Sequence, residues 1–243
     1  TNNVMYFSIG SNRLQINQTE CNAFRGSSGS VAESSTGEHV PIKEFVSQIY
    51  FEGLPLHQAA TYGEEDVDVL LSMLNDSSQT QYHENIALTL GMIGSQRATD
   101  PLISYINTPP AGQIARPAYK GKVGAIVALG YLVNRSGSEK ALSYLLESVS
   151  PNTWKQRNLR KLSKPGMTKT QTGQDLSKYA IIALGLSGHP KASEQLRQLR
   201  DQRGAVIEGS SQGKMQDVVI ESLKTNEKIS REGLLKYYER TPR

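Results

Sequence analysis

The feature that most constrains the fold is a short pattern that occurs three times along the chain. Residues 87–94, 125–132 and 180–188 are apolar stretches with helical spacing, each containing alanine, leucine and glycine in that order. Each is followed by a short polar turn and by a second stretch with helical apolar spacing. Such recurrence predicts stacked helical pairs, because one pair cannot bury its apolar face alone.

The glycines that align between these segments are Gly91, Gly130 and Gly185. A small residue at this place lets the two helices of a pair approach closely, and glycine tolerates the left-handed backbone of a helix end. The second helices begin with turn residues near Pro101 and Pro190, where proline suits the first turn. We therefore predict that each aligned glycine ends the first helix of a pair.

The Ala-Leu-Gly unit, the polar turn and the leucine-rich second helix resemble HEAT repeats, especially the short HEAT-like type found in phycobilisome lyases and many bacterial scaffolds. The resemblance covers roughly residues 55–200 and concerns packing residues, not chemistry. It implies an all-α fold, an α-solenoid of the HEAT/armadillo-like superhelical type, and a role in protein binding. The aligned glycines are 39 and 55 residues apart, whereas short repeats of this kind run at about 30 residues.

The extra length predicts two loop insertions within a HEAT-like helical domain at 41–243. The first insertion, 107–122, is rich in proline and glycine, and the second, 150–177, is polar and rich in turn residues. Insertions in a stacked helical array project from one face, which is often the face that binds.

The first and last helices of this domain are also visible in the pattern. The domain is expected to begin near Pro41, and the apolar face of its first helix holds Ile42, Phe45, Val46 and Ile49. At the other end, residues 216–238 predict a last helical pair that caps the array.

Residues 1–40 predict a non-helical arm and a linker. Residues 4–9 are β-prone and residues 14–16 alternate apolar with polar, so a short β-hairpin and an irregular extended arm both fit. Between 26 and 38, nine of 13 residues are Gly, Ser or Thr, which predicts a linker or a long loop.

The second insertion contains the strongest candidate for a binding site. It combines the only tryptophan with a run of cations, and the predicted partner-binding residues are Trp154, Lys155, Arg157, Arg160, Lys161 and Lys164. Such a segment grips an acidic protein face or phosphates, with the indole as an anchor. The structural alternative is a solvated loop that packs Trp154 and Leu159 against the helices.

Charge is distributed unevenly along the chain. Residues 1–109 hold 12 Asp/Glu and 4 Lys/Arg, whereas residues 110–243 hold 23 Lys/Arg and 11 Asp/Glu, for a net charge of +4. This asymmetry favours acidic partners at the C-terminal end. The Ser-, Thr- and Asn-rich start favours export to a periplasm or the exterior, with a signal removed before Thr1, and the cytoplasm stays open as the alternative.

No catalytic, metal or cofactor pattern is present in the sequence. The histidines at 39, 57, 83 and 189 are scattered, and Cys21 is the only cysteine, which excludes zinc sites built from paired cysteines. No apolar stretch approaches the roughly 18 residues of a membrane-spanning helix. We therefore expect no enzyme activity, no cofactor and no membrane span.

These observations predict a non-catalytic protein–protein interaction scaffold that uses a HEAT-like surface and a basic projecting loop. The alternative is a nucleic-acid-binding protein or a HEAT-like nucleic-acid enzyme, since stacked helices lined with basic residues cradle a duplex. The enzymatic version needs a carboxylate and aromatic residues on the concave face, and the sequence does not identify such a set.

Overall fold

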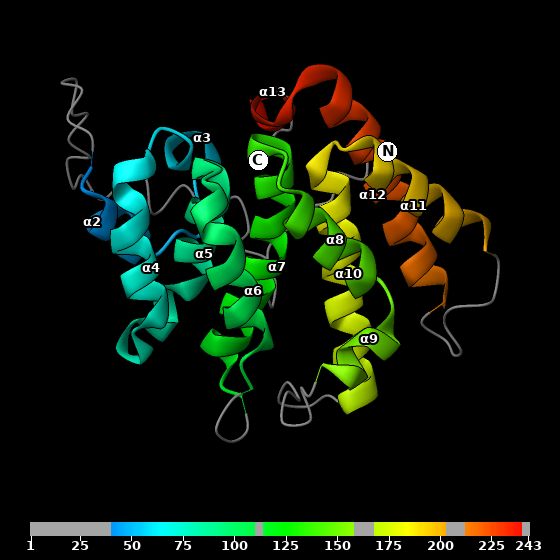
Figure 1. Cartoon of the computed structure of the whole chain (residues 1–243), viewed down its shortest axis with the longest axis horizontal. Coiled ribbons are helices and arrows are strands. Elements are labelled where there is room, and N and C mark those ends of the chain that lie inside the picture. The colour runs from blue at the N-terminus through cyan, green and yellow to red at the C-terminus, as the bar shows by residue number, and fades with distance from the viewer. Residues whose placement is uncertain (1–39, 110–113, 158–167, 203–211, 240–243) are drawn as a thin grey trace, which may run out of the picture.

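The computed structural model describes residues 40–109, 114–157, 168–202 and 212–239. Within these ranges the chain forms α-helices and short 3-10 helices, and no residue there lies in a β-strand (Figure 1). The all-α prediction is therefore confirmed for this part of the chain. The arm and linker predicted at 1–40 lie outside it except for Val40.

The first helices are short. They are α2 (Ile42–Ser47), α3 (Leu56–Ala59) and α4 (Val67–Asn75), the last preceded by a 3-10 turn. Most of the predicted apolar face of α2 is buried, but α2 ends at Ser47 and Ile49 is 82% exposed. The prediction for Ile49 is wrong because Gln48 adopts an extended backbone and leads the chain away from the helix.

Longer helices follow from residue 83 onward. They are α5 (His83–Ile93), α6 (Thr99–Asn107), α7 (Arg116–Ser136), α8 (Glu139–Ser148), α9 (Pro151–Gln156), α10 (Lys169–Ser187), α11 (Pro190–Asp201), α12 (Gln212–Glu232) and α13 (Leu234–Glu239). Helices α5, α7, α10 and α12 pack against one another in that order and form a row. Of the others, α6 packs on α7, α8 on α7 and α10, and α11 on α8, α10 and α12.

The three aligned glycines lie at the contacts within this row. The backbone atoms nearest to a Cβ added at Gly91, Gly130 and Gly185 belong to Ala128, Ala183 and Ser222 of the next helix. The separation would be 2.8 Å for the first and third, and an added Cβ at Gly130 would overlap a carbonyl oxygen. Glycine is needed for the close approach, as predicted, but the partner is the next helix of the row and not the second helix of the same pair.

Other glycines end these helices. Gly94, Gly137 and Gly188 follow α5, α7 and α10 with φ of 80°, 64° and 60°, and Gly233 follows α12 with φ of 86°. The prediction that the aligned glycines end the helices is therefore wrong, since the left-handed residue comes later in each case. The next residue then begins the following turn or helix with a side-chain cap, at Ser95, Ser138 and His189.

Helix α7 begins inside the insertion predicted at 107–122. It starts at Arg116 with Pro117 in its first turn. Residues 116–122 are therefore helical, and the prediction of a loop over these residues is wrong. The glycines there make close packing between helices possible, because a Cβ on Gly121 would overlap the Tyr105 hydroxyl. A Cβ added at Gly124 would lie 3.2 Å from the backbone of Glu84, which is a tight contact but not an overlap.

The C-terminal helices differ from a simple capping pair. Helix α12 packs on α10 and α11, as an end helix does, but α13 turns away after Gly233 and contacts α3 near the other end of the chain (Figure 1). The hydroxyls of Tyr131 in α7 and Tyr238 in α13 lie 2.9 Å apart. The last helix therefore links the α12 end of the row to the first helices.

Candidate interaction surface

The predicted binding segment begins as a helix and not as a projecting loop. Ser150 caps α9 by accepting a hydrogen bond from the backbone N–H of Asn152, and Pro151 lies in its first turn. At the other end of the predicted insertion, α10 begins at Lys169, capped by Thr168. The insertion predicted at 150–177 is thus helical at both ends, and residues 158–167 lie outside the described chain.

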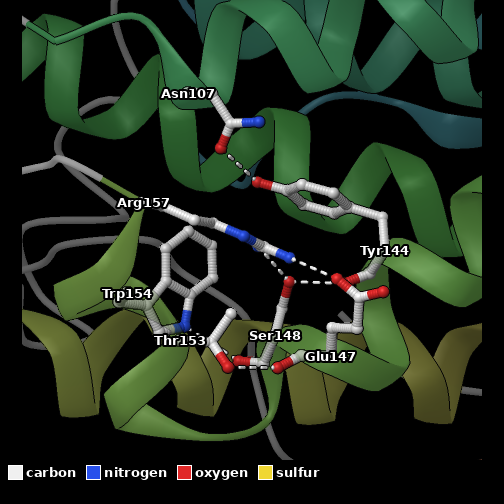
Figure 2. Close-up of polar contacts among 7 residues, drawn as sticks. All are labelled: Asn107, Tyr144, Glu147, Ser148, Thr153, Trp154 and Arg157. Atoms are coloured by element: carbon white, nitrogen blue, oxygen red, sulfur yellow. Dashed lines mark hydrogen bonds and ion pairs between the residues drawn. The ribbon is translucent and has the colours of Figure 1, made fainter.

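Trp154 points into the protein. Its side chain is 2% exposed, and the indole Nε1 donates a hydrogen bond of 2.8 Å to the backbone carbonyl of Ser148 at the end of α8 (Figure 2). The hydroxyl of Thr153 donates to the carbonyl of Glu147 at 2.8 Å. Helix α9 is therefore fastened to the end of α8, and the indole has no free face to offer a partner.

Arg157 is enclosed beside Trp154. Its guanidinium lies over the Tyr144 ring at 3.9 Å from the centroid and over the Trp154 ring at 5.2 Å (Figure 2). It donates to the Ser148 hydroxyl at 2.6 Å and pairs with Glu147 at 3.3 Å. With 14% of the side chain exposed, Arg157 makes a partly desolvated cation–π contact, which is the stronger kind.

Tyr144 completes this anchor, which we define as Tyr144, Ser148, Trp154 and Arg157. The Tyr144 hydroxyl donates to the side-chain oxygen of Asn107 at 2.9 Å, which ties the anchor to the end of α6. Burial raises the pKa of Tyr144 to about 12, although the Arg157 guanidinium opposes this. The phenol therefore stays neutral at any physiological pH.

The remaining predicted site residues separate from the anchor. Lys155 is exposed on α9 and is free to meet a partner, whereas Arg160, Lys161 and Lys164 lie outside the described residues. The structure thus divides the predicted set into two enclosed side chains, one exposed cation and three cations that it does not describe.

A buried polar cluster that the sequence did not reveal lies between α5, α6 and α7. The Lys122 Nζ donates to three carbonyl oxygens at the end of α6, those of Tyr105 (2.6 Å), Ile106 (3.1 Å) and Thr108 (2.7 Å). The side chain is 5% exposed, and this burial lowers the pKa of Lys122 to about 8. Lys122 closes the helix end, where carbonyls lack partners within the helix.

His83 belongs to the same cluster and has a defined tautomer. Its Nε2 lies 3.0 Å from the Asp76 carbonyl, which only accepts, so Nε2 carries the proton. Nδ1 then accepts from the Tyr105 hydroxyl at 2.9 Å. Burial lowers the pKa of His83 and keeps the ring neutral. Both ring nitrogens are thus used to hold helices together.

Two further polar contacts connect neighbouring helices of the row. Glu84 of α5 lies 3.7 Å from Lys120 of α7, and burial raises the pKa of Glu84 although Lys120 opposes the shift. The Tyr119 hydroxyl of α7 donates to Asp175 of α10 at 2.7 Å. Sequence spacing gives no sign of these pairs, because their members are 36 and 56 residues apart.

A scan against protein-family models, a search of curated proteins and a search of solved structures each find no match for this chain. Among the described residues, no three His, Cys, Asp or Glu side chains gather in a metal-binding arrangement. None of the helices that the structure describes has the length and apolar content needed to cross a bilayer.

Proposed function

We propose that this chain is a non-catalytic interaction scaffold, a HEAT-like α-solenoid that presents a basic segment to an acidic face of a protein partner. The observation that carries the proposal is the anchor at the end of α8. In this anchor, Trp154 and Arg157 fix the start of the segment that contains the other predicted cations. Fixing one end of a segment lowers the entropy that is lost when the segment binds.

The solenoid part of the proposal is supported by a packing step that recurs. In the row α5, α7, α10 and α12, a helical glycine contacts the next helix three times in succession. We call these contacts the glycine seam. Nearest-neighbour contacts of one kind are typical of stacked helical arrays, in which each unit touches only its neighbours.

A second recurring feature is a series of exposed ion pairs between elements that flank the row. Arg97–Glu64 joins the 3-10 turns that precede α6 and α4, Lys140–Asp100 joins α8 to α6, and Lys191–Glu139 joins α11 to α8. We call these pairs the ion-pair ridge. Their regular order along the chain supports the same stacking, although ion pairs in water contribute little to stability.

The protein-binding role is supported by charge. The second half of the chain carries 23 of the 27 Lys/Arg residues, and Lys155 is exposed at the anchored end of the segment. Electrostatic complementarity of this kind speeds encounter with acidic partners and selects against basic ones. The same cations also attract phosphates, so nucleic acid is the competing ligand that an experiment must separate.

The test is site-specific photo-cross-linking from position 155 in cells that make the protein. We expect a cross-linked protein band that resists nuclease treatment. A second variant changes Lys155, Arg160, Lys161 and Lys164 to Glu, so its probe is placed at Gln156 instead of position 155. In this variant the band should be lost. A matched control changes the exposed Lys191, Arg200, Lys224 and Lys236 to Glu and should keep the band.

Each other outcome has a definite meaning. A cross-linked product that disappears with nuclease identifies nucleic acid as the ligand and overturns the protein-scaffold proposal. A product that survives in the four-site variant shows that the basic segment is not the binding element. Equal loss in the control variant shows that total charge, and not this segment, governs binding.

A further inference from the structure

Two large apolar side chains stand almost fully exposed on one loop between α2 and α3. Ile49 is 82% exposed and Phe51 is 98% exposed, and no other large apolar side chain of the described residues is comparably exposed. Single exposed apolar residues are ordinary, but two of them in one short loop point to a surface that something covers.

Hydrogen bonds fix the chain next to these two residues. The Asn85 side chain donates to the carbonyls of Val46 at 3.0 Å and Gln48 at 3.1 Å. Between the exposed pair, Tyr50 turns inward, and its hydroxyl donates to the Phe45 carbonyl at 2.8 Å. Ile49 and Phe51 are therefore presented on a fixed support, which reduces the entropy lost when they are covered.

The size of the patch limits what can cover it. A buried aromatic side chain removes about 150–250 Å² from water, so the pair offers a few hundred Å² in all. A stable complex between separate proteins buries about 800 Å² on each partner. A second copy or a free partner would need contacts well beyond this loop. A segment of the same chain needs fewer, because tethering gives it a high effective concentration.

Such a tether joins the described chain beside the loop. The Val40 carbonyl accepts a hydrogen bond of 2.7 Å from the Tyr62 hydroxyl, and the Tyr62 ring packs on Phe45 at 4.9 Å. The 39 residues before Val40 include Val-Met-Tyr-Phe-Ser-Ile at 4–9, a concentrated apolar run. The 30 residues between Ile9 and Val40 span up to about 100 Å when extended, so reach sets no limit.

We propose that residues 4–9 of the same chain dock on Ile49 and Phe51 and cover these two side chains. The inference does not depend on the partner-binding role of the basic segment. Apolar side chains predominate on both sides of the contact, and neither residues 4–9 nor residues 49–51 include a charged side chain.

The test uses the full chain with Phe51 replaced by the photo-cross-linker p-benzoylphenylalanine, which keeps an aromatic side chain. We expect cross-links from position 51 to residues 4–9, with a yield that does not change with protein concentration. In the double variant Tyr6→Ser, Phe7→Ser, this yield should fall about tenfold or more, because the apolar contact is lost. The same cross-linker at the exposed Asp217 of α12 is the control and should give no product with residues 4–9.

Two results would overturn the proposal. Cross-links between different chains that grow with concentration would make a second copy the occupant. A yield to residues 4–9 that is equal from positions 51 and 217 would show that the segment meets the surface at random. Circular dichroism and the melting temperature of each variant check that the helices are intact.

Discussion

The glycine seam and the ion-pair ridge recur in the same order along the chain, yet they act through opposite physics. At the seam, backbone atoms of successive helices touch where even one methyl group has no room. At the ridge, the paired side chains are all more than half exposed, so water screens them. Recurrence alone therefore does not show how much a contact contributes to stability. Exclusion of water decides how much each contact contributes.

The largest effect is expected at the seam. Gly130→Ala would force a Cβ into the Ala183 carbonyl, and we expect a loss of about 2–3 kcal/mol, since overpacking exceeds the gain in helix propensity. Gly173→Ala is the matched control, because that helical glycine has ordinary room at 3.4 Å. There the free energy of unfolding should rise by up to about 1 kcal/mol. Urea denaturation measures the free energy of unfolding of both variants. Equal changes would contradict the claim that the glycine seam has no room for a methyl group.

The next largest effect is expected at Lys122, a buried cation. It tests whether the different contributions of the seam and the ridge to stability come from charge or from burial. Lys122 has a pKa of about 8 in the folded protein, against 10.5 ordinarily. The unfolded chain therefore binds more protons between these values, so stability rises with pH above about 8. We expect a gain of up to about 2 kcal/mol by pH 9.5, and no such rise in Lys122→Met.

The pH range for that experiment has an upper limit. Burial raises the pKa of Tyr131 to about 12, so the folded state holds its proton where the unfolded state begins to lose it near 10. Stability then falls as pH increases above about 10, and this fall would mask the rise in stability that comes from Lys122. Parallel curves for the native chain and Lys122→Met between pH 7 and 9.5 would show that the three carbonyls keep the ammonium charged.

A smaller effect is expected at the anchor. Arg157→Met keeps the length of the side chain but removes the cation from the Tyr144 ring and the donor from Ser148. We expect a loss of about 1–2 kcal/mol in the free energy of unfolding. Lys155→Met, two residues away and exposed, should change it little. A similar loss in both variants would mean that Arg157 behaves like an ordinary surface charge.

The smallest effect is expected on the ridge itself. Lys140→Met breaks the pair with Asp100, and we expect a change below about 0.5 kcal/mol that disappears in high salt. Thermal unfolding at low and high ionic strength measures it. A salt-independent loss comparable with that at Gly130 would remove the distinction between ridge and seam.

Much of the helical frame could be predicted from the sequence, because its signals are local. Apolar spacing located the later parts of α7 and α10 but left their first turns in predicted loops, and Pro190 marked a helix start correctly. The alignment also identified the three seam glycines. It could not tell which helix each glycine touches, since that depends on how pairs stack and not on spacing within one pair.

The candidate site was harder to predict for the same reason. The run from Trp154 to Lys164 resembles a solvated basic loop, and nothing local shows that Ser148 and Tyr144 receive Trp154 and Arg157. Lys122 was likewise hidden within a segment that looks like a proline- and glycine-rich loop. Its burial depends on α6, whose last carbonyls it satisfies.

The return of α13 to α3 gives the molecule a mechanical property that an open helical array lacks. An array held together only by contacts between neighbouring units can unfold from its ends, one unit at a time. Here the Tyr131–Tyr238 contact joins residues 107 positions apart, so the terminal helix cannot peel off without breaking a link to the middle of the row. Because α13 contacts both α3 and α7, we expect unfolding to proceed as one cooperative event instead of unit by unit.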